Sequence, residues 1–226
     1  MKRRLAALLC LVAALLRLAP TVLSYADEAH KDERLIALTF DDGPHPGNTG
    51  RILDILKKYD VRATFFILGC NAKYYPVPLM RAIEEGHEIE NHSMDHKTAG
   101  MDTEALEKSI QDTAALITLM TGRRPRYFRP PGGKCTEEMQ RAIHRLGYEA
   151  VYWTIDSEDW KGKSAESITS SVMKSVRGND IVLFHDYTCP HDNTVEALDS
   201  LIPRLLLAGY RFVTLEEMKN RTASHF

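Results

Sequence analysis

Two adjacent aspartates, Asp41 and Asp42, end a short apolar run and stand directly before a Gly-Pro turn. Residues 35–38 are apolar and partly β-branched, which predicts a buried strand that stops at Gly43. Two carboxylates this close resist joint ionisation, so a folded protein keeps both ionised only where a cation or an arginine neutralises them. Taken alone, the pair fits a plain turn better, because Asp, Gly and Pro all favour turns.

Two histidines downstream, His92 and His96, complement the aspartate pair. Their i, i+4 spacing predicts that both rings project from one face of a helical turn, about 6 Å apart, within reach of one ion. With one aspartate they make a two-histidine, one-carboxylate set that leaves a coordination position open. An open position indicates a catalytic metal site rather than a structural one.

The chain alternates apolar segments of strand length with amphipathic segments of helix length. Strands are predicted over 35–38, 61–68, 87–91, 127–128, 149–155, 181–184 and 211–213. Helices are predicted over 51–59, 77–85, 103–120, 136–146, 167–176 and 195–207. This alternation predicts an α/β fold with a parallel sheet and right-handed crossovers. About seven strands, rather than eight, predict a distorted or incomplete (β/α) barrel.

Polar clusters follow five of the predicted strands. They lie at 41–42, 92–96, 129–133, 156–160 and 185–186. The carboxyl ends of parallel strands share one face of a barrel, so we expect these clusters to converge on one site.

The clusters form five motifs whose types and order resemble the polysaccharide deacetylases, carbohydrate esterase family four, also called the NodB-homology domain. The motifs are Thr-Phe-Asp-Asp-Gly-Pro from 39, His-Ser-Met-Asp-His from 92, Arg-Pro-Pro-Gly-Gly from 129, Asp-Ser-Glu-Asp-Trp from 156 and Leu-Phe-His from 183. The resemblance runs from about residue 35 to residue 218, nearly the whole chain after its first segment.

The resemblance implies roles for the acidic and histidine residues that the chemistry needs. Asp41 is expected to be the general base and His185 the general acid. The expected ligands of a divalent metal are Asp42, His92 and His96. Zinc is the expected metal, with cobalt or nickel as alternatives; a bound zinc ion lowers the pKa of its water from about 15.7 to about 7.

The resemblance also implies supporting and substrate-binding residues. Arg129 is expected to hold Asp41, and Asp159 to hold His185. The expected substrate-binding residues are Pro131, Gly132, Trp160 and Leu183, with an oxyanion-binding backbone N–H near Gly132. The family often has Tyr where Gly132 stands, so the preference for substrate is expected to differ here.

The expected function is metal-dependent N-deacetylation of N-acetylhexosamine residues in a polysaccharide, with peptidoglycan as the first candidate. Two alternatives are a chitooligosaccharide deacetylase and an esterase that removes O-acetyl groups from xylan-type glycans, because one activated water serves both bonds. A non-catalytic glycan-binding module is disfavoured, since every ionisable group that the chemistry needs is present. We expect the protein to act as a monomer.

The first 26 residues have the layout of a secretory signal peptide: basic residues 2–4, an apolar run over 5–16 and a small-x-small pattern at 24–26. The catalytic domain is then expected over 27–226, in the cell envelope or secreted; an uncleaved membrane anchor is the alternative. Cleavage removes four positive charges and takes the formal charge from −2 to −6. So acidic a protein is not expected to bind nucleic acid.

Three cysteines remain after the predicted cleavage, Cys70, Cys135 and Cys189. An odd number leaves two patterns open, one disulfide with a free thiol or three free thiols. Their spacing matches no zinc site.

Overall fold

The structure is a computed structural model that describes residues 33–97, 101–187 and 193–223. The predicted signal peptide and Cys189 lie outside the described residues. Cys70 and Cys135 are both free thiols. None of the described helices has the length and apolar character needed to cross a membrane.

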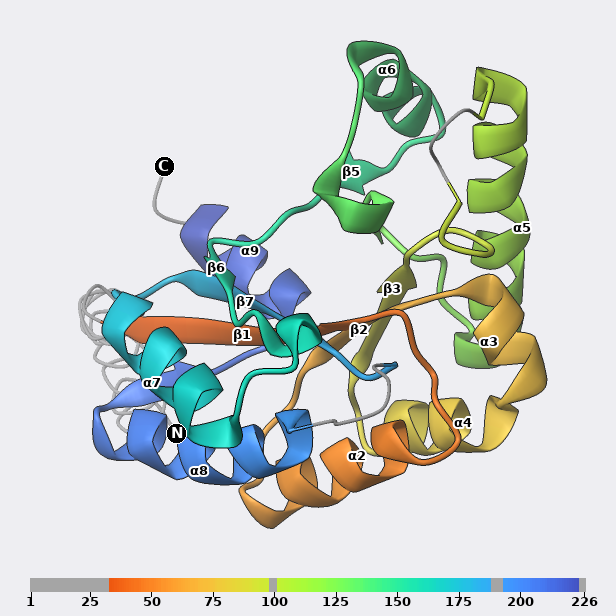
Figure 1. The fold of residues 1–226 in the computed structure, drawn as a ribbon. Helices are drawn as coiled ribbons and strands as arrows, with labels where there is room; N and C mark the ends of the chain where they lie inside the picture. The colour runs from red at the N-terminus through yellow and green to blue at the C-terminus, as the bar shows by residue number, and fades with distance from the viewer. Residues whose placement is uncertain (1–32, 98–100, 188–192, 224–226) are drawn as a thin grey trace, which may run out of the picture. The chain divides into compact units, whose positions relative to one another are not determined.

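Seven parallel strands form a curled half-barrel, which confirms the predicted fold class (Figure 1). These seven strands of the described residues are β1 (Arg34–Asp41), β2 (Thr64–Ile67), β3 (Glu88–Asn91), β4 (Tyr127–Phe128), β5 (Glu149–Ala150), β6 (Ile155–Asp156) and β7 (Asp180–His185); an eighth strand is β8 (Tyr210–Phe212). Their order is β5-β4-β3-β2-β1-β7-β6, and β8 pairs with β1 beside this path. The barrel is therefore incomplete between β5 and β6, the two edge strands of the parallel path.

The single strand predicted over 149–155 is wrong, because the structure divides it into β5 and β6 at opposite edges of the sheet. Val151 N–H still donates to the carbonyl of Phe128 at one edge, whereas Thr154 N–H donates to the carbonyl of Ile181 at the other. Residues 151–154 therefore cross the gap in the barrel. Val151 and Ile155 are buried at the two edges, whereas Tyr152 and Trp153 between them are only half-buried and Thr154 is exposed, so the apolar run is not one continuous strand.

Helices connect the strands, and the six predicted helices are confirmed with small changes in their ends. The helices are α2 (Asn48–Lys58), α3 (Gly69–Tyr74), α4 (Pro76–Glu84), α5 (Thr103–Thr121), α6 (Glu137–Arg145), α7 (Ala165–Ser175), α8 (Thr194–Leu207) and α9 (Leu215–Ala223), with the 3₁₀ turns η1 (Pro131–Gly133) and η2 (Asp159–Lys161). Two were not predicted: α3 has only six residues, and α9 is mostly polar.

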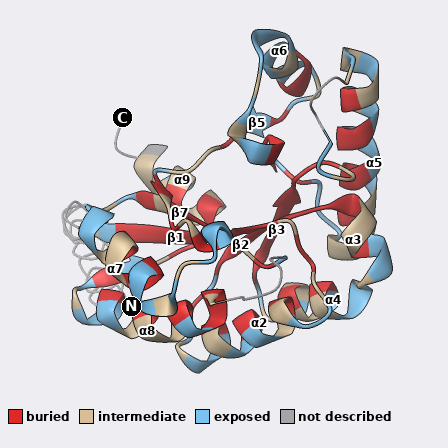
Figure 2. Cartoon of the chain, viewed as in Figure 1, coloured by how far each residue is buried: buried red, intermediate tan, exposed pale blue. Residues whose placement is uncertain are grey.

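The central strands are buried along their length (Figure 2), and every residue of β1 after Arg34 is buried. The outer face of β1 carries Phe40, whose ring stacks on Phe65 at 5.0 Å and Phe184 at 5.8 Å within the main core beneath the helices. Side chains alternate along a strand, so Thr39 and Asp41 point to the inner face. Burial of Phe40 thus fixes the direction of the first aspartate.

Candidate active site

Parallel pairing aligns the ends of the strands that carry the predicted site. Asp41 at the end of β1 is the cross-strand partner of His185 at the end of β7. On the other side, β2 and β3 pair in register up to Asn91, which precedes His92. Arg129 directly follows β4 and donates its backbone N–H to the carbonyl of Asn91. Asp156 at the end of β6 is the cross-strand partner of Leu183 on β7, so all five predicted clusters meet along neighbouring strands.

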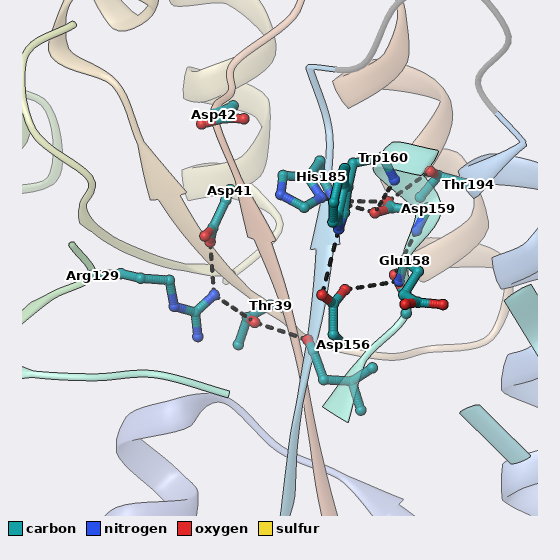
Figure 3. A network of polar contacts seen from close by, with 12 residues as sticks. Thr39, Asp41, Asp42, Arg129, Asp156, Glu158, Asp159, Trp160, His185 and Thr194 are labelled. Atoms are coloured by element: carbon teal, nitrogen blue, oxygen red, sulfur yellow. Dashed lines mark hydrogen bonds and ion pairs between the residues drawn. The ribbon is translucent and has the colours of Figure 1, made fainter. Parts of the chain in front are cut away.

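A buried ion pair joins Asp41 to Arg129 (Figure 3). The guanidinium Nη1 lies 2.7 Å from Asp41 Oδ1 and 2.8 Å from the hydroxyl of Thr39, and no part of Arg129 is exposed. The same guanidinium lies 4.0 Å from the centre of the Phe66 ring. Burial lowers the pKa of Arg129, although Asp41 acts to raise it. Arg129 thus orients one carboxylate oxygen of Asp41 and leaves the other for the site.

Asp42, His92 and His96 form the cluster predicted as metal ligands. Asp42 Oδ1 lies 3.4 Å from His92 Nε2 and 3.3 Å from His96 Nε2. Burial alone would raise the pKa of Asp42, but the neighbouring histidines His92, His96 and His185 lower it overall. The carboxylate is therefore held ionised between the two rings.

The predicted helical turn over His92 and His96 is wrong, because these residues lie in a loop after β3. Ser93 has a φ of 77° and His96 a φ of 63°, both left-handed. Asn91 Oδ1 accepts the N–H of Ser93, and Ser93 Oγ accepts the N–H of His96. These local side-chain bonds replace helical ones. The loop still brings the ring centres to 5.2 Å, so the pairing holds without the helix.

The chemistry of this cluster fits a cation. His92 Nδ1 lies 2.7 Å from the carbonyl oxygen of Arg129, which can only accept, so Nδ1 carries a proton, and in the neutral ring Nε2 presents a lone pair. That lone pair faces Asp42 Oδ1, a buried oxygen that accepts a hydrogen bond from none of the described residues. Two acceptors 3.4 Å apart repel each other unless a positive charge lies between them. A divalent metal bound by three ligands satisfies both, with an open side for substrate.

His185 is held by Asp159 at a second place in the site. Asp159 Oδ1 accepts from His185 Nδ1 at 2.8 Å, and Oδ2 accepts from the backbone N–H of His185 at 2.8 Å and from the hydroxyl of Thr194 at 2.9 Å. Burial would lower the pKa of His185, but Asp159, Asp41 and Asp42 together raise it to about 9. His185 Nε2 therefore carries a proton at neutral pH in the metal-free protein.

This pKa predicts a pH-dependent contribution to the stability of the metal-free protein. The folded pKa of about 9 lies above the ordinary 6.5, so the contribution is complete below pH 6.5 and is lost as the pH rises through about 9. Its size is at most about 3 kcal/mol. His185→Gln should lower the free energy of unfolding by up to this amount at pH 6 and by far less at pH 10, measured by urea unfolding. The exposed His144→Gln is the control. Equal losses at both pH values would contradict a raised pKa.

A groove of about 1360 Å³ begins beside the metal cluster. Its walls include His96, Pro131 and Gly132 together with the first turns of α5 and α6. Gly132 has a φ of 62°, and a Cβ added there would meet nothing within 4 Å. The position where the family resemblance led us to expect an aromatic side chain is therefore open space.

The other two predicted substrate-binding residues lie on the β7 side. Leu183 is buried on β7 two residues before His185, and its carbonyl accepts the N–H of Ser157. Trp160 follows Asp159 on η2 and is 54% exposed; its ring N–H donates to Asp156 Oδ2 at 3.4 Å. Neither residue lines the groove beside His96. The structure thus places the four residues on two sides of the site.

Sequence reasoning missed three polar side chains that support this site. Thr39 accepts from Arg129, Thr194 donates to Asp159, and the amide of Asn71 donates to the carbonyl of Asp42 at 2.7 Å. Thr39 lies inside the first motif and could have been found there. Thr194 and Asn71 begin or lie within helices and carry no spacing signal toward the motifs.

The chain is similar to known carbohydrate deacetylases. Residues 28–151 match the family model described as polysaccharide deacetylase. A Bacillus cereus protein named peptidoglycan-N-acetylglucosamine deacetylase is 39% identical over 194 residues, which cover 84% of this chain and 91% of that protein. Bacillus subtilis PdaC, named a peptidoglycan-N-acetylmuramic acid deacetylase, is 40% identical over 195 residues, but these cover only 40% of its length.

The fold agrees with these similarities. The solved structure of peptidoglycan deacetylase PdaC from Bacillus subtilis superposes with a TM-score of 0.79 at 35% identity, over 86% of this chain and 94% of that one. The chain therefore belongs to the polysaccharide deacetylase family.

Proposed function

We propose that this protein is a metal-dependent N-deacetylase that hydrolyses the acetamide groups of N-acetylhexosamine residues in peptidoglycan. One observation carries this proposal: a carboxylate base, a three-ligand cluster for a cation and a protonated imidazole end neighbouring strands of one half-barrel. Acetamide hydrolysis needs these three groups, because it needs an activated water, a stabilised oxyanion and a protonated leaving amine.

Asp42, His92 and His96 would hold the metal, and zinc fits their nitrogen and carboxylate ligands, with cobalt or nickel as alternatives. When bound, such an ion would lower the pKa of a water molecule and polarise the acetyl carbonyl.

Asp41 accepts the proton of the attacking water in this proposal. Its Oδ1 is occupied by Arg129, while Oδ2 lies on the side of the metal cluster, 3.7 Å from His92 Nε2. Arg129 and Thr39 hold the side chain in one orientation, so little reorganisation is needed at the moment of transfer. The backbone N–H of Gly132 would bind the oxyanion, a contact typically worth about 3 kcal/mol.

His185 donates the proton that lets the sugar amine leave. Asp159 fixes its Nδ1, which directs the Nε2 proton away from Asp159. The raised pKa keeps that proton in place at neutral pH until the amine needs it. Trp160 and Leu183 would bound the acetyl group on this side.

Peptidoglycan is the proposed substrate because both curated relatives described above are named for it. They are named for different sugars, N-acetylglucosamine and N-acetylmuramic acid. Gly132 leaves open space in the wall of the groove beside His96, and this space supports the proposal that the groove admits a substituted sugar. All residues of the proposed site come from one chain, so we propose that the monomer is active.

We also propose that residues 1–26 direct export to the cell envelope, where this polymer lies. The N-terminus of the native protein should then be Asp27 or within a few residues of it, as read by N-terminal sequencing or intact mass. Retention of Met1 would instead favour an uncleaved membrane anchor.

Acetate release from three substrates tests the proposed function. Peptidoglycan, chitin oligomers and acetylated xylan are offered to the zinc-loaded protein at equal acetyl concentration. We expect the fastest release from peptidoglycan. Faster release from chitin oligomers would favour a chitooligosaccharide deacetylase, and release from xylan alone would favour an esterase.

A further inference from the structure

We infer that Asp186 and Thr49 are positioning residues for the metal site: together they hold the turn after Asp42 against the end of β7. The inference rests on the proposed function only in taking Asp42 as a metal ligand. Neither residue belongs to the chemistry described above; the sequence placed Asp186 near the site with His185 but gave it no role, and it gave Thr49 none.

Asp186 is a buried carboxylate directly behind His185. It is 1% exposed, and its backbone N–H donates to the carbonyl of Asp41 at 3.2 Å. Its Oδ2 accepts a short hydrogen bond, 2.6 Å, from the hydroxyl of Thr49. A buried carboxylate is costly unless it is bonded in this way. Asp186 therefore ties β7 to both sides of the turn, at Asp41 before it and at Thr49 after it.

The helix that follows the turn, α2, has Gly47 as its N-cap, without a side-chain cap, so its first backbone N–H groups are bonded from elsewhere. The Nδ1 of His45 accepts the backbone N–H groups of Gly47 and Asn48 at 3.1 and 3.0 Å. Thr49 is instead 1% exposed inside α2, and its oxygen accepts the N–H of His45 at 2.7 Å. Because the oxygen is occupied, the hydroxyl proton points to Asp186.

The carboxylate of Asp186 also lies against Gly43, the residue next to Asp42. A Cβ on Gly43 would come within 2.1 and 2.2 Å of the two carboxylate oxygens, so only glycine fits this contact. Gly43 is further fixed by its carbonyl, which accepts the N–H of Leu68 at 2.9 Å. Asp186 thus packs on the backbone that leads directly from the metal ligand.

Asp42 needs such support because its φ of 75° is left-handed, a strained conformation for a residue with a side chain. Strained backbone persists only where its surroundings determine it. The backbone of Asp42 is held on one side by the Thr49–Asp186 bond and by the packing of Asp186 on Gly43. On the other side it is held by the hydrogen bond from Asn71 to the Asp42 carbonyl. Loss of the Thr49–Asp186 bond should let Asp42 relax away from His92 and His96.

The zinc affinity of the metal-free full chain tests this inference without any measurement of deacetylation. Thr49→Val removes the donor at nearly constant volume, and Asp186→Ala removes the acceptor. We expect each variant to bind zinc about 10-fold more weakly than the wild type in competition with a chromophoric chelator, the usual effect of losing a group that orients a ligand. Thr49→Ser keeps the hydroxyl and should bind zinc like the wild type.

Thr169→Val is the matched control, because Thr169 is equally buried and loses one hydrogen bond, to the carbonyl of Ala197 at 3.2 Å, away from the site. It should lower the melting temperature without changing zinc affinity. Wild-type zinc affinity in Thr49→Val, or in Asp186→Ala if Thr49→Val does not fold, would overturn the inference and leave the proposed function intact. Equal weakening in Thr49→Ser and Thr49→Val would also overturn it. A wild-type protein that binds no zinc would instead overturn the proposed metal site, and this inference with it.

Discussion

Replacing His96 with alanine is expected to remove the bound metal and lower deacetylase activity by roughly a hundredfold or more, since even a residue that only orients a ligand is typically worth about 10–100-fold. Without His96, only Asp42 and His92 remain as protein ligands. Two ligands are too few to compete with water for the ion. Metal content per chain and turnover should fall together. His96 is partly exposed, so the loss should leave the fold intact.

Removing the metal from the wild-type protein with a chelator should have the same effect on activity as removing His96. Exhaustive treatment of the wild type with a chelator should abolish turnover, and added zinc or cobalt should restore it. His144→Ala, on the exposed face of α6, controls for the loss of any histidine and should keep both metal and activity. Undiminished turnover in the chelated wild type would rule out the metal site.

Replacing His185 with alanine is expected to separate two kinds of substrate. An amine leaves only when it is protonated, whereas a good phenolate leaves without help, so the variant should lose roughly 100-fold or more on an acetamide and far less on an activated aryl acetate. The ratio of kcat/KM for the two substrates measures this directly. The pH profile of the wild-type kcat/KM should be bell-shaped, with limbs that belong to the coupled site.

Asp41→Asn provides the comparison for His185→Ala. Both substrates need an activated water, so this variant should lose activity on both to a similar degree. Its side chain keeps an oxygen that can accept from Arg129. Equal losses on both substrates for His185→Ala would remove the acid role and leave His185 as a positioning or oxyanion-binding group.

The sequence predicted that the polar ends of the strands converge, because alternating strands and helices indicate a parallel sheet. Once β1, β2, β3 and β7 are parallel neighbours, the residues that follow them must meet, whatever the details of each loop. Asp41 opposite His185 is the clearest case. This argument uses only the period of the apolar residues, which is the strongest signal in a single sequence.

Local geometry was less predictable. The i, i+4 spacing of His92 and His96 suggested a helix, but Asn91 and Ser93 bond to the backbone of the loop and exclude it. Spacing gives proximity in either conformation, so the pairing was right for the wrong reason. The split of 149–155 into two strands depends on where the barrel opens, a property of the whole sheet that no short segment carries.

The supporting residues were the hardest to predict. Thr194 lies 35 positions after Asp159, and Asp186 meets Thr49 across 137 positions. Such contacts follow from tertiary packing alone. Thr49 carries no spacing signal toward the motifs, and only the fold brings its hydroxyl to Asp186.

The stoichiometry of the two products tests the central claim most directly. Peptidoglycan is treated with the zinc-loaded protein, and acetate and new primary amine groups on the sugars are counted in the same sample. The proposed mechanism predicts one amine for each acetate released, with neither product formed by Asp41→Asn. Acetate without new amine would show that the protein cleaves an ester, and would contradict the assignment of this site to N-deacetylation.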